Sequence, residues 1–440
     1  MMEIKQKYDA YMKQIQGKPG LWEVNGETKE HLSLFYEEGK RISGGTDHQT
    51  VLYARAGETA TGYAVSQCLS DDPAALLQQA AENGSVLGNN GAAKGGVVPG
   101  NENVCSVEER KPLADVETLK QIVDRAEAEL PCEKKTFAIK NTVHSQFVSN
   151  QKGLSRYYSR SHFELNAYVD GREYVATATA PELMQFQNMA ADIAEMAKND
   201  LPEIKIPSGN YRAILSNYVM NMFWITGWML FSGRSYAGGA GAFAGRFLQQ
   251  IASEKVSIQD VPALPEIGYE APFDCEGTDG VAVDLIKDGV FSGLLHNLET
   301  AQKMGMDPTG NAGRTAGLVV GTDVTITPKN FLMCPGTVSD EEMLAKLGDG
   351  LYVFDAFDQF HAVNSASGQF SFPCSAVLVE GGVRKGVVRG LTMNGSMGDL
   401  LMDVEAVGDR LSYMPLLMHY TYQVAAPAIL VKNLNVTVNI

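Results

Sequence analysis

The fold class is decided by the stretch Val281-Ala282-Val283-Asp284-Leu285-Ile286-Lys287-Asp288-Gly289-Val290-Phe291-Ser292-Gly293-Leu294-Leu295-His296-Asn297. Two strand-like runs, residues 281–287 and 290–297, flank the dipeptide Asp288-Gly289. Because Asp-Gly readily adopts the backbone angles of a two-residue turn, the stretch predicts a β-hairpin.

Similar turn signals occur elsewhere in the chain. Gly381-Gly382 separates two further strand-like runs, and Asn150-Gln151-Lys152-Gly153 and Asp170-Gly171 divide the alternating pattern of residues 136–170. Gly44-Gly45 is predicted as the turn between two earlier strands. Consecutive hairpins favour an antiparallel sheet over a doubly wound parallel one.

Helices are predicted where apolar residues recur with helical spacing, over residues 2–16, 74–83, 115–130, 181–201 and 218–231. Asp71-Asp72-Pro73 is a good start for the second helix, and Gly84 is its predicted end.

The length of 440 residues favours two domains. Residues 202–209 hold two prolines and a Ser-Gly pair and are the best candidate for a boundary. The sequence therefore predicts an α+β fold. Residues 1–205 would form an N-terminal α/β domain of antiparallel strands and helices, and residues 206–440 a β-rich antiparallel C-terminal domain.

The charge balance bears on the class of partner. The chain carries 36 basic and 52 acidic residues, which gives a formal net charge of −16. Phosphate-backbone binding needs a concentrated basic surface, so this balance argues against a nucleic-acid partner.

The sequence also predicts a cytoplasmic protein that does not insert into a membrane. The first 13 residues are charged and helix-like, unlike a secretory signal. The most apolar segment, residues 218–231, is shorter than the roughly 20 residues that a membrane span needs. The six cysteines show no CxxC spacing, which is typical of free thiols in a cytosolic protein.

Motifs of the common catalytic classes are incomplete. Gly238-Gly239-Ala240-Gly241 lacks the GxxxxGK[ST] order of a phosphate loop, and residues 233–237 approach the GxSxG serine elbow but end in alanine. No two histidines have the spacing of an HExxH or HxH zinc motif. A site assembled from distant residues could use His361 with Asp355 and Asp358, near Cys374. In a regular strand, however, Asp358 would point away from the other two.

The helix over residues 218–231 contains three methionines and two tryptophans. Such a run usually packs in a core. Met and Trp also favour adaptable apolar surfaces, so a contribution to a peptide groove or a subunit interface is the alternative.

Several segments, in order along the chain, resemble the TldD/PmbA family of bacterial peptide-processing proteins. They are residues 53–64, 149–153, 251–260, 273–295, 309–314, 363–372 and 390–395, the fourth of which begins Phe273-Asp274-Cys275-Glu276-Gly277. The resemblance covers most of the chain and implies an N-terminal α/β domain followed by a β-rich C-terminal domain.

In this family, TldD-type members are zinc peptidases that cut flexible peptides and work with a PmbA/TldE partner. The resemblance implies zinc ligands from an HExxxH helix and from a cysteine near the C-terminus. Here the histidine positions fall around Trp224 and Met229, no cysteine follows Cys374, and the C-terminal region offers only His419. The resemblance therefore points to the PmbA/TldE branch and carries over no catalytic or metal-binding residue.

The resemblance implies a component of a metallopeptidase system for proteolysis and maturation of flexible peptides. This chain would be the non-metal-binding subunit that shapes the peptide channel, and zinc would reside in an HExxxH partner. Two alternatives stay open: an active metallopeptidase with a rebuilt metal site, and a stand-alone homodimer that binds peptides.

Five residues of the resembling segments are candidates for contact with a peptide or partner, because binding groups tend to lie in loops on a rigid sheet. They are Asn297, Asn311, Arg314, Asn364 and Gly368. The alternative is that Asn and Gly are there only for turn geometry.

Overall fold

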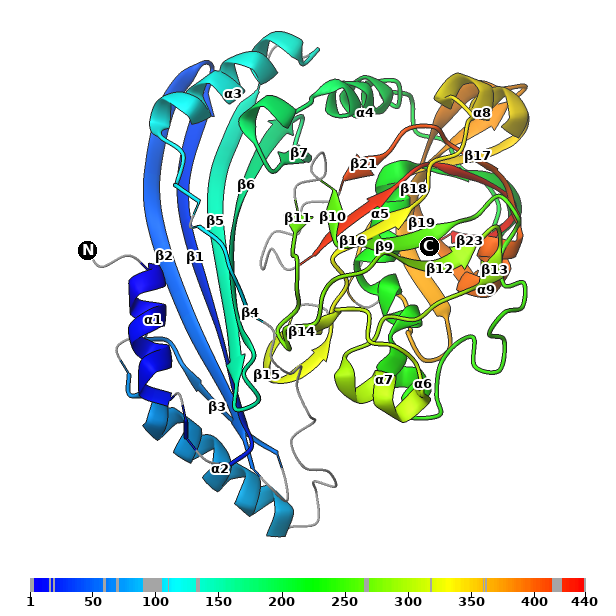
Figure 1. Ribbon diagram of the computed structural model, residues 1–440. Helices are drawn as coiled ribbons and strands as arrows, with labels where there is room; N and C mark the ends of the chain where they lie inside the picture. Colours follow the sequence, from blue (N-terminus) through cyan, green and yellow to red (C-terminus); the bar gives the residue numbers. More distant parts are fainter. Residues whose placement is uncertain are drawn as a thin grey trace.

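A computed structural model describes residues 4–15, 17–18, 20–57, 61–68, 71–89, 105–109, 111–131, 135–264, 269–316, 319–358, 360, 362–413 and 422–438. Figure 1 shows a long, curved sheet on one side and a second body of strands and helices against its hollow face.

The first sheet is built from the N-terminal half of the chain. Its strands are β1 (Trp22–Glu37), β2 (Lys40–Ala56), β3 (Gly62–Ser66), β4 (Cys105–Val107), β5 (Thr136–Asn150), β6 (Ser155–Val169) and β7 (Arg172–Ala178). They lie in the order β3-β2-β1-β5-β6-β4, and β7 also pairs with β6. All pairs are antiparallel except β4 with β6. The hairpins predicted at residues 150–153 and 170–171 are confirmed.

The turn predicted at Gly44-Gly45 is wrong. Both glycines lie inside β2, and the chain turns earlier, at Glu38-Gly39, where φ is 48° and 72°. A two-residue turn of this kind matches the twist of the flanking strands. Residues 40–49 of β2 are exposed throughout, and β3 pairs only with residues 52–56.

Three helices cover the outer face of this sheet: α1 (Ile4–Ile15), α2 (Pro73–Asn89) and α3 (Val116–Glu129). The ring of Tyr8 on α1 lies 4.5 Å from that of Phe147 on β5. The predicted end of α2 at Gly84 is wrong, because the helix continues to residue 89. A Cβ on Gly62 of β3 would lie 2.1 Å from the backbone nitrogen of Gly84, so these glycines mark where helix and strand pack closely.

The connection to the second half runs through a short 3-10 helix, η1 (Pro181–Leu183), and α4 (Gln187–Ala197). These replace the single helix predicted over residues 181–201. The following segment adds to the second half, since Ile204 N donates to Val387 O at 2.8 Å.

The second half contains two six-stranded sheets. One has the order β13-β12-β9-β16-β22-β21 and comprises β9 (Ile258–Val261), β12 (Val283–Lys287), β13 (Val290–Phe291), β16 (Asn330–Met333), β21 (Ser412–Tyr413) and β22 (Gln423–Ala426). The other has the order β19-β18-β17-β8-β23-β20 and comprises β8 (Gly209–Leu215), β17 (Gly350–Ala356), β18 (Gln369–Glu380), β19 (Val383–Ser396), β20 (Val404–Val407) and β23 (Ile429–Val438).

β19 also pairs with β23, which closes five of the strands of the second of these sheets into a ring. Two small hairpins complete the strands: β10 (Ala263–Leu264) with β11 (Tyr269–Glu270), and β14 (Ala312–Ala316) with β15 (Val319–Ile326). The predicted hairpins at Asp288-Gly289 and Gly381-Gly382 are confirmed. The α+β class is confirmed too, although β8 with β17 and β16 with β22 are parallel.

The second half also has six short helical segments. They are α5 (Asn217–Gly227), η2 (Trp228–Phe231), α6 (Gly233–Ala237), α7 (Leu298–Met304), α8 (Asp340–Leu347) and α9 (Met397–Met402). α5 lies in the core between the two sheets. Phe223 packs 4.4 Å from Phe372 on β18, and Trp224 packs 5.2 Å from Phe331 on β16, measured between ring centroids. Among the described helices, none combines the length and apolar character needed to cross a membrane.

Candidate functional site

The core helix α5 lies beside the strands that flank residues 414–421. Asn221 Nδ2 donates to the backbone oxygen of Ser412 at 2.9 Å, on β21. The hydroxyl of Tyr422, next to β22, donates to Ile225 O at 2.9 Å, and its ring lies 5.8 Å from that of Trp228. The fold thus brings together two chain segments almost 200 residues apart. These are the segments from which the resemblance implies metal ligands.

The α5 side chains at this place are not metal ligands. Trp224 is completely buried and contacts the rings of Phe231 and Phe331. Met229, on η2, packs against the same core. Over the described parts of the chain, no three His, Cys, Asp or Glu side chains are grouped so that they could hold a metal ion. Zinc needs N, O or S donors, so the α5 residues present do not fit it. His419 lies outside the described residues.

The alternative metal set is described in part. Asp355 on β17 forms an ion pair with Arg172 on β7. Burial raises the pKa of Asp355, and the Arg172 guanidinium opposes this shift. Cys374 is buried on β18 opposite Ala356. His361 lies outside the described residues, so this set stays a prediction.

A buried ion-pair cluster joins the first sheet to the second half. Arg55 on β2 contacts Glu23 on β1 at 3.0 Å and Glu276 at 2.8 Å, and these three residues are only 4%, 2% and 1% exposed. The second carboxylate oxygen of Glu276 accepts from Leu298 N, at the start of α7. Removing charges from water is costly, and here the cost is offset by this close pairing.

A second contact lies beside the first. Arg156 on β6 donates to Gly277 O at 2.9 Å and to Asp279 at 2.6 Å, and its guanidinium lies 4.3 Å from the ring centroid of Phe273. Tyr158 meets the same ring edge-on. The segment of residues 273–279, at the start of the longest resembling stretch, is therefore the part of the second half that seats against the inner face of the first sheet.

Asp274 organises this segment from within. Its Oδ1 accepts from the backbone nitrogens of Glu276 and Thr278, and its Oδ2 from that of Ala312. Burial, together with the nearby Glu276 carboxylate, raises the pKa of Asp274 to about 7. Burial likewise raises the pKa of Asp260 to about 6.

Three of the five candidate contact residues gather around this segment. Asn297 caps α7 by accepting from Thr300 N at 2.9 Å. Asn311 Nδ2 donates to Asp260 at 2.7 Å, and the Arg314 guanidinium lies 4.0 Å from the ring centroid of Tyr53 on β2. All three are buried, so they hold the junction between the two halves.

The other two candidates lie in a separate, tight turn. Asn364 is exposed, and its Oδ1 accepts from the backbone nitrogens of Ala366 and Ser367. Gly368 has φ of 73°, which favours glycine, and a Cβ there would lie 3.3 Å from Ala242. The turn thus lies against the Gly/Ala-rich segment of residues 233–245.

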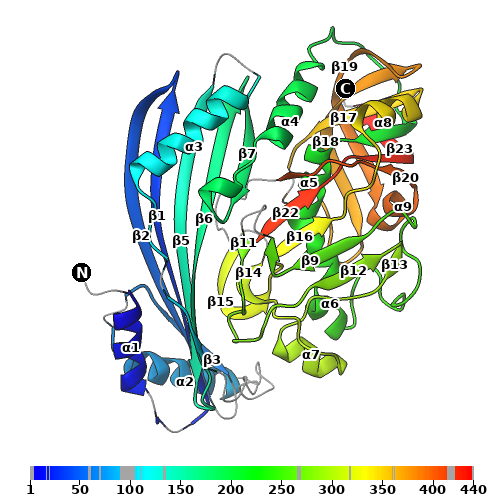
Figure 2. The same ribbon diagram turned by 45° about the horizontal axis from the view of Figure 1, so that its top comes forward.

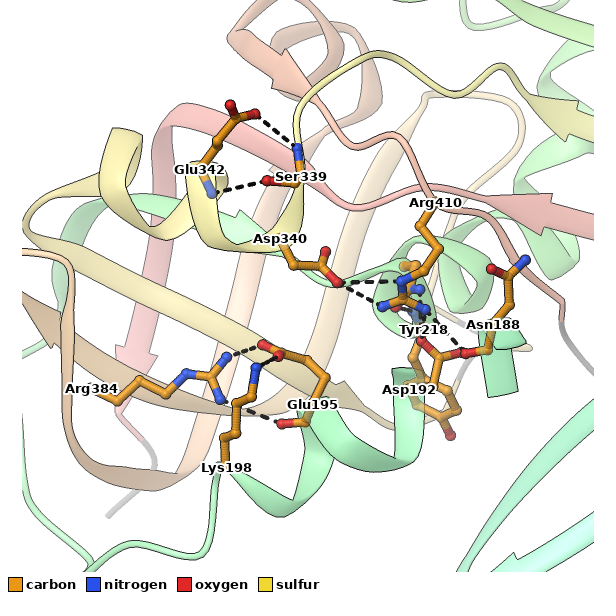
Figure 3. A network of polar contacts seen from close by, with 11 residues as sticks. Asn188, Asp192, Glu195, Lys198, Tyr218, Ser339, Asp340, Glu342, Arg384 and Arg410 are labelled. Atoms are coloured by element: carbon orange, nitrogen blue, oxygen red, sulfur yellow. Dashed lines mark hydrogen bonds and ion pairs between the residues drawn. The ribbon is translucent and has the colours of Figure 1, made fainter. Parts of the chain in front are cut away.

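A further set of ion pairs fixes α4 to the second half (Figure 3). Arg410 contacts Asp192 on α4 and, at 2.9 Å, Asp340 on α8. Arg384 on β19 contacts Glu195, one turn further along α4. Sequence reasoning missed this set because its partners lie about 190 to 220 residues apart. The only local signal was the i, i+3 spacing of Asp192 and Glu195 on one helix face.

A small cavity of about 40 Å³ lies next to this set, between the two halves. Its walls include Arg172 and Asn199 from the first half and Asn217, Tyr218 and Tyr413 from the second. The Arg172 guanidinium lies 4.2 Å from the ring centroid of Tyr218. The volume is enough for only a few water molecules.

The inner face of the first sheet also carries a band of histidines and acidic residues. His144 Nε2 on β5 lies 3.8 Å from Glu27 on β1, and His162 Nε2 on β6 lies 3.9 Å from Glu164. Burial would raise the pKa of Glu27, but the contact with His144 and nearby cations lowers it to about 2. The band is therefore a charged, largely desolvated surface.

Comparison with known proteins decides the family. The family model described as the PmbA/TldA metallopeptidase C-terminal domain matches residues 208–438, more than half of the chain. The chain belongs to the PmbA/TldD family.

Relatives within the PmbA/TldD family match over shorter stretches. A metalloprotease of Archaeoglobus fulgidus is 32% identical over 179 residues, which is 40% of each chain. Metalloprotease PmbA of Escherichia coli O157:H7 is 29% identical over 161 residues, 37% of this chain and 32% of that one. The chain thus spans well under two thirds of the length of these curated relatives.

Solved structures of similar fold match over nearly the whole chain. TldE from Thermococcus kodakarensis has a TM-score of 0.75 at 18% identity, with 98% of this chain and 99% of that chain covered. A Thermotoga maritima protein, described as a candidate modulator of DNA gyrase, also has a TM-score of 0.75, at 22% identity, with 99% and 100% covered. At these identities, the likeness shows the fold alone.

Proposed function

We propose that this PmbA/TldD chain is the non-metal-binding, PmbA/TldE-like subunit of a cytoplasmic metallopeptidase system. In this proposal an HExxxH partner subunit supplies the zinc, and this chain shapes the channel through which flexible peptides reach it for proteolysis or maturation.

One observation carries the proposal. Helix α5 lies beside the segments that flank residues 414–421, yet it carries the buried Trp224 where the resemblance implies a histidine. Trp224 is held by Phe331 and Phe231 in the middle of the core. A ligand-bearing helix needs side chains that can converge on an ion with a position open to water, and this packing leaves neither at Trp224.

The inner face of the first sheet supports the channel role. Histidines and carboxylates form a band over β1, β5 and β6 on the side that faces the second half. Polar groups of this kind can receive the main-chain amides and charged ends of an extended peptide.

The first test measures zinc in protein purified without added metal or chelator. We expect close to no zinc per chain, and cleavage of an unstructured peptide only after an HExxxH subunit is added. About one tightly held zinc per chain, with chelator-sensitive cleavage by this chain alone, would instead favour the rebuilt metal site. Peptide binding without cleavage, even with the partner present, would favour a stand-alone, homodimeric binding protein.

A second test addresses the channel wall. With the partner present, the His144→Gln/His162→Gln variant is expected to raise KM for the peptide several-fold. His48→Gln is the matched control, because His48 is an exposed histidine that pairs with Glu30 on the opposite face of the same sheet. Equal KM values for the double variant and the wild type would remove the band from the proposal.

A further inference from the structure

A cavity of about 390 Å³ lies in the second half, away from α5. It is bounded by β8, the end of α8, α9, β20 and β23, which lie together on the side remote from the first sheet (Figure 2). Its polar lining comprises Arg212, Ser253, Lys255, Lys346, Glu405 and Lys432.

The single carboxylate of this lining is already paired. Arg212 Nε donates to Glu405 Oε2 at 2.7 Å, and Arg212 Nη1 donates to the backbone oxygens of Lys346 and Leu347 at the end of α8. Arg212 thus neutralises Glu405 and fixes the wall of the cavity.

Three lysines remain. Lys255 Nζ donates to the backbone oxygen of Glu405, which neutralises no charge. Within the described residues, neither Lys346 nor Lys432 has a carboxylate within ion-pair distance. Counting Arg212 against Glu405, the lining carries three uncompensated positive charges in a chain whose net charge is −16.

We propose that this cavity binds a compact polyanion, a small compound with two or more phosphate or carboxylate groups. Three ammonium groups around one cavity repel each other, and a multiply charged anion would relieve that repulsion. Lysine is an effective point-charge partner for such oxyanions. Cavities of a few hundred Å³ are the size of small-molecule sites.

The shape of the lining narrows the ligand class. Its apolar members are the aliphatic Met402, Val404 and Leu430 with Ala406, and it includes no aromatic ring. A nucleobase would find no stacking partner here, so the structure favours a ligand without one. None of the lining residues belongs to α5, and the inference therefore stands apart from the proposed peptidase role.

The test is calorimetric titration of the full chain with inorganic phosphate, pyrophosphate and citrate at low and moderate salt. Binding is expected to strengthen from phosphate to the two more highly charged ions and to weaken with salt. The two ions also separate the phosphate source from the carboxylate source.

The decisive variant is Lys346→Gln/Lys432→Gln, which removes two exposed charges without touching a core residue. Binding of pyrophosphate or citrate is expected to weaken about tenfold or more. The matched control is Lys120→Gln/Lys303→Gln, which removes two exposed lysines from α3 and α7 and should leave binding unchanged. Circular dichroism of both variants verifies the fold.

Three results would overturn the inference. The first is no binding of any of the three ions up to on the order of 10 mM. The second is equal weakening in the control variant, since that would show only general surface attraction. The third is tighter binding of an oligoglutamate peptide than of the small ions, because the occupant would then be an acidic chain.

Discussion

Arg55 on β2 donates to Glu276 at 2.8 Å, so two residues 221 positions apart in sequence form a buried ion pair between the halves of the chain. Glu23 on β1 completes the cluster from the other side. The pair sits at the head of residues 273–295, the longest stretch on which the family resemblance rests.

Replacing Arg55 by Met is expected to lower the free energy of unfolding by about 3–5 kcal/mol, because Glu23 and Glu276 would stay buried without a cation. Chemical denaturation of wild type and variant measures this. Lys120→Met is the control, because its partner Asp124 is exposed, and it should change stability by about 1 kcal/mol or less. The triple variant Arg55→Met/Glu23→Gln/Glu276→Gln should recover part of the loss. No recovery would show that the arginine acts through packing.

Asp260 makes stability depend on pH in an unusual direction. Its pKa in the folded chain is raised by burial from 3.8 to about 6, so between these values the folded state binds the proton and the unfolded state does not. Its contribution is therefore complete below about pH 4 and is lost as the pH rises through 6. The loss is on the order of 2–3 kcal/mol at most.

The measurement is the free energy of unfolding at several pH values for wild type and Asp260→Asn. The difference between the two proteins should fall from pH 4 to pH 7. Carboxyl groups with lowered pKa, such as that of Glu27, act in the opposite direction but cancel in this difference. A difference that is constant with pH would show that Asp260 does not titrate in this range.

Asn297 is expected to act as a helix cap. Asn297→Ala should lower stability by about 1 kcal/mol, and Asn297→Asp or Asn297→Ser should restore most of it, because each supplies an acceptor for Thr300 N. Thermal unfolding of the three variants provides the measurement. Peptide binding that is lost in all three while stability returns would instead indicate direct contact with a ligand.

Arg410 is expected to hold α4 against the second half. In Arg410→Met, backbone hydrogen exchange over residues 187–197 should accelerate, because Asp192 and Asp340 lose their shared cation. The matched control is Arg234→Met, which breaks an exposed pair with Asp323. Exchange that changes equally in both variants would argue against a specific role.

The sequence predicted the parts of the fold that depend on neighbouring residues. Asp288-Gly289 forms the expected hairpin because its turn geometry is local. Gly44-Gly45 misled the prediction, since glycine in a strand looks like glycine in a turn, and Glu38-Gly39 supplied the turn instead. Gly84 was read as a helix end although it marks close packing against Gly62.

The candidate site was predictable only in part. Asn297, Asn311 and Arg314 were singled out by resemblance, and the structure places them together, but their burial could not be read from spacing. The ion pair of Arg410 with Asp192 joins elements 218 residues apart, and no local pattern indicates such a partner. Tertiary arrangement alone decides which charged side chains meet.

The junction between the two halves is held at two places. Arg55 and Arg156 hold one end, near β3, and Arg172 and Arg410 hold the other, around α4 and β7 (Figure 1). A joint fixed at one end can swing like a door, whereas a joint fixed at both ends behaves as a brace. The molecule is therefore built to keep its shape under load, and whatever must yield for a peptide to enter has to be a loop.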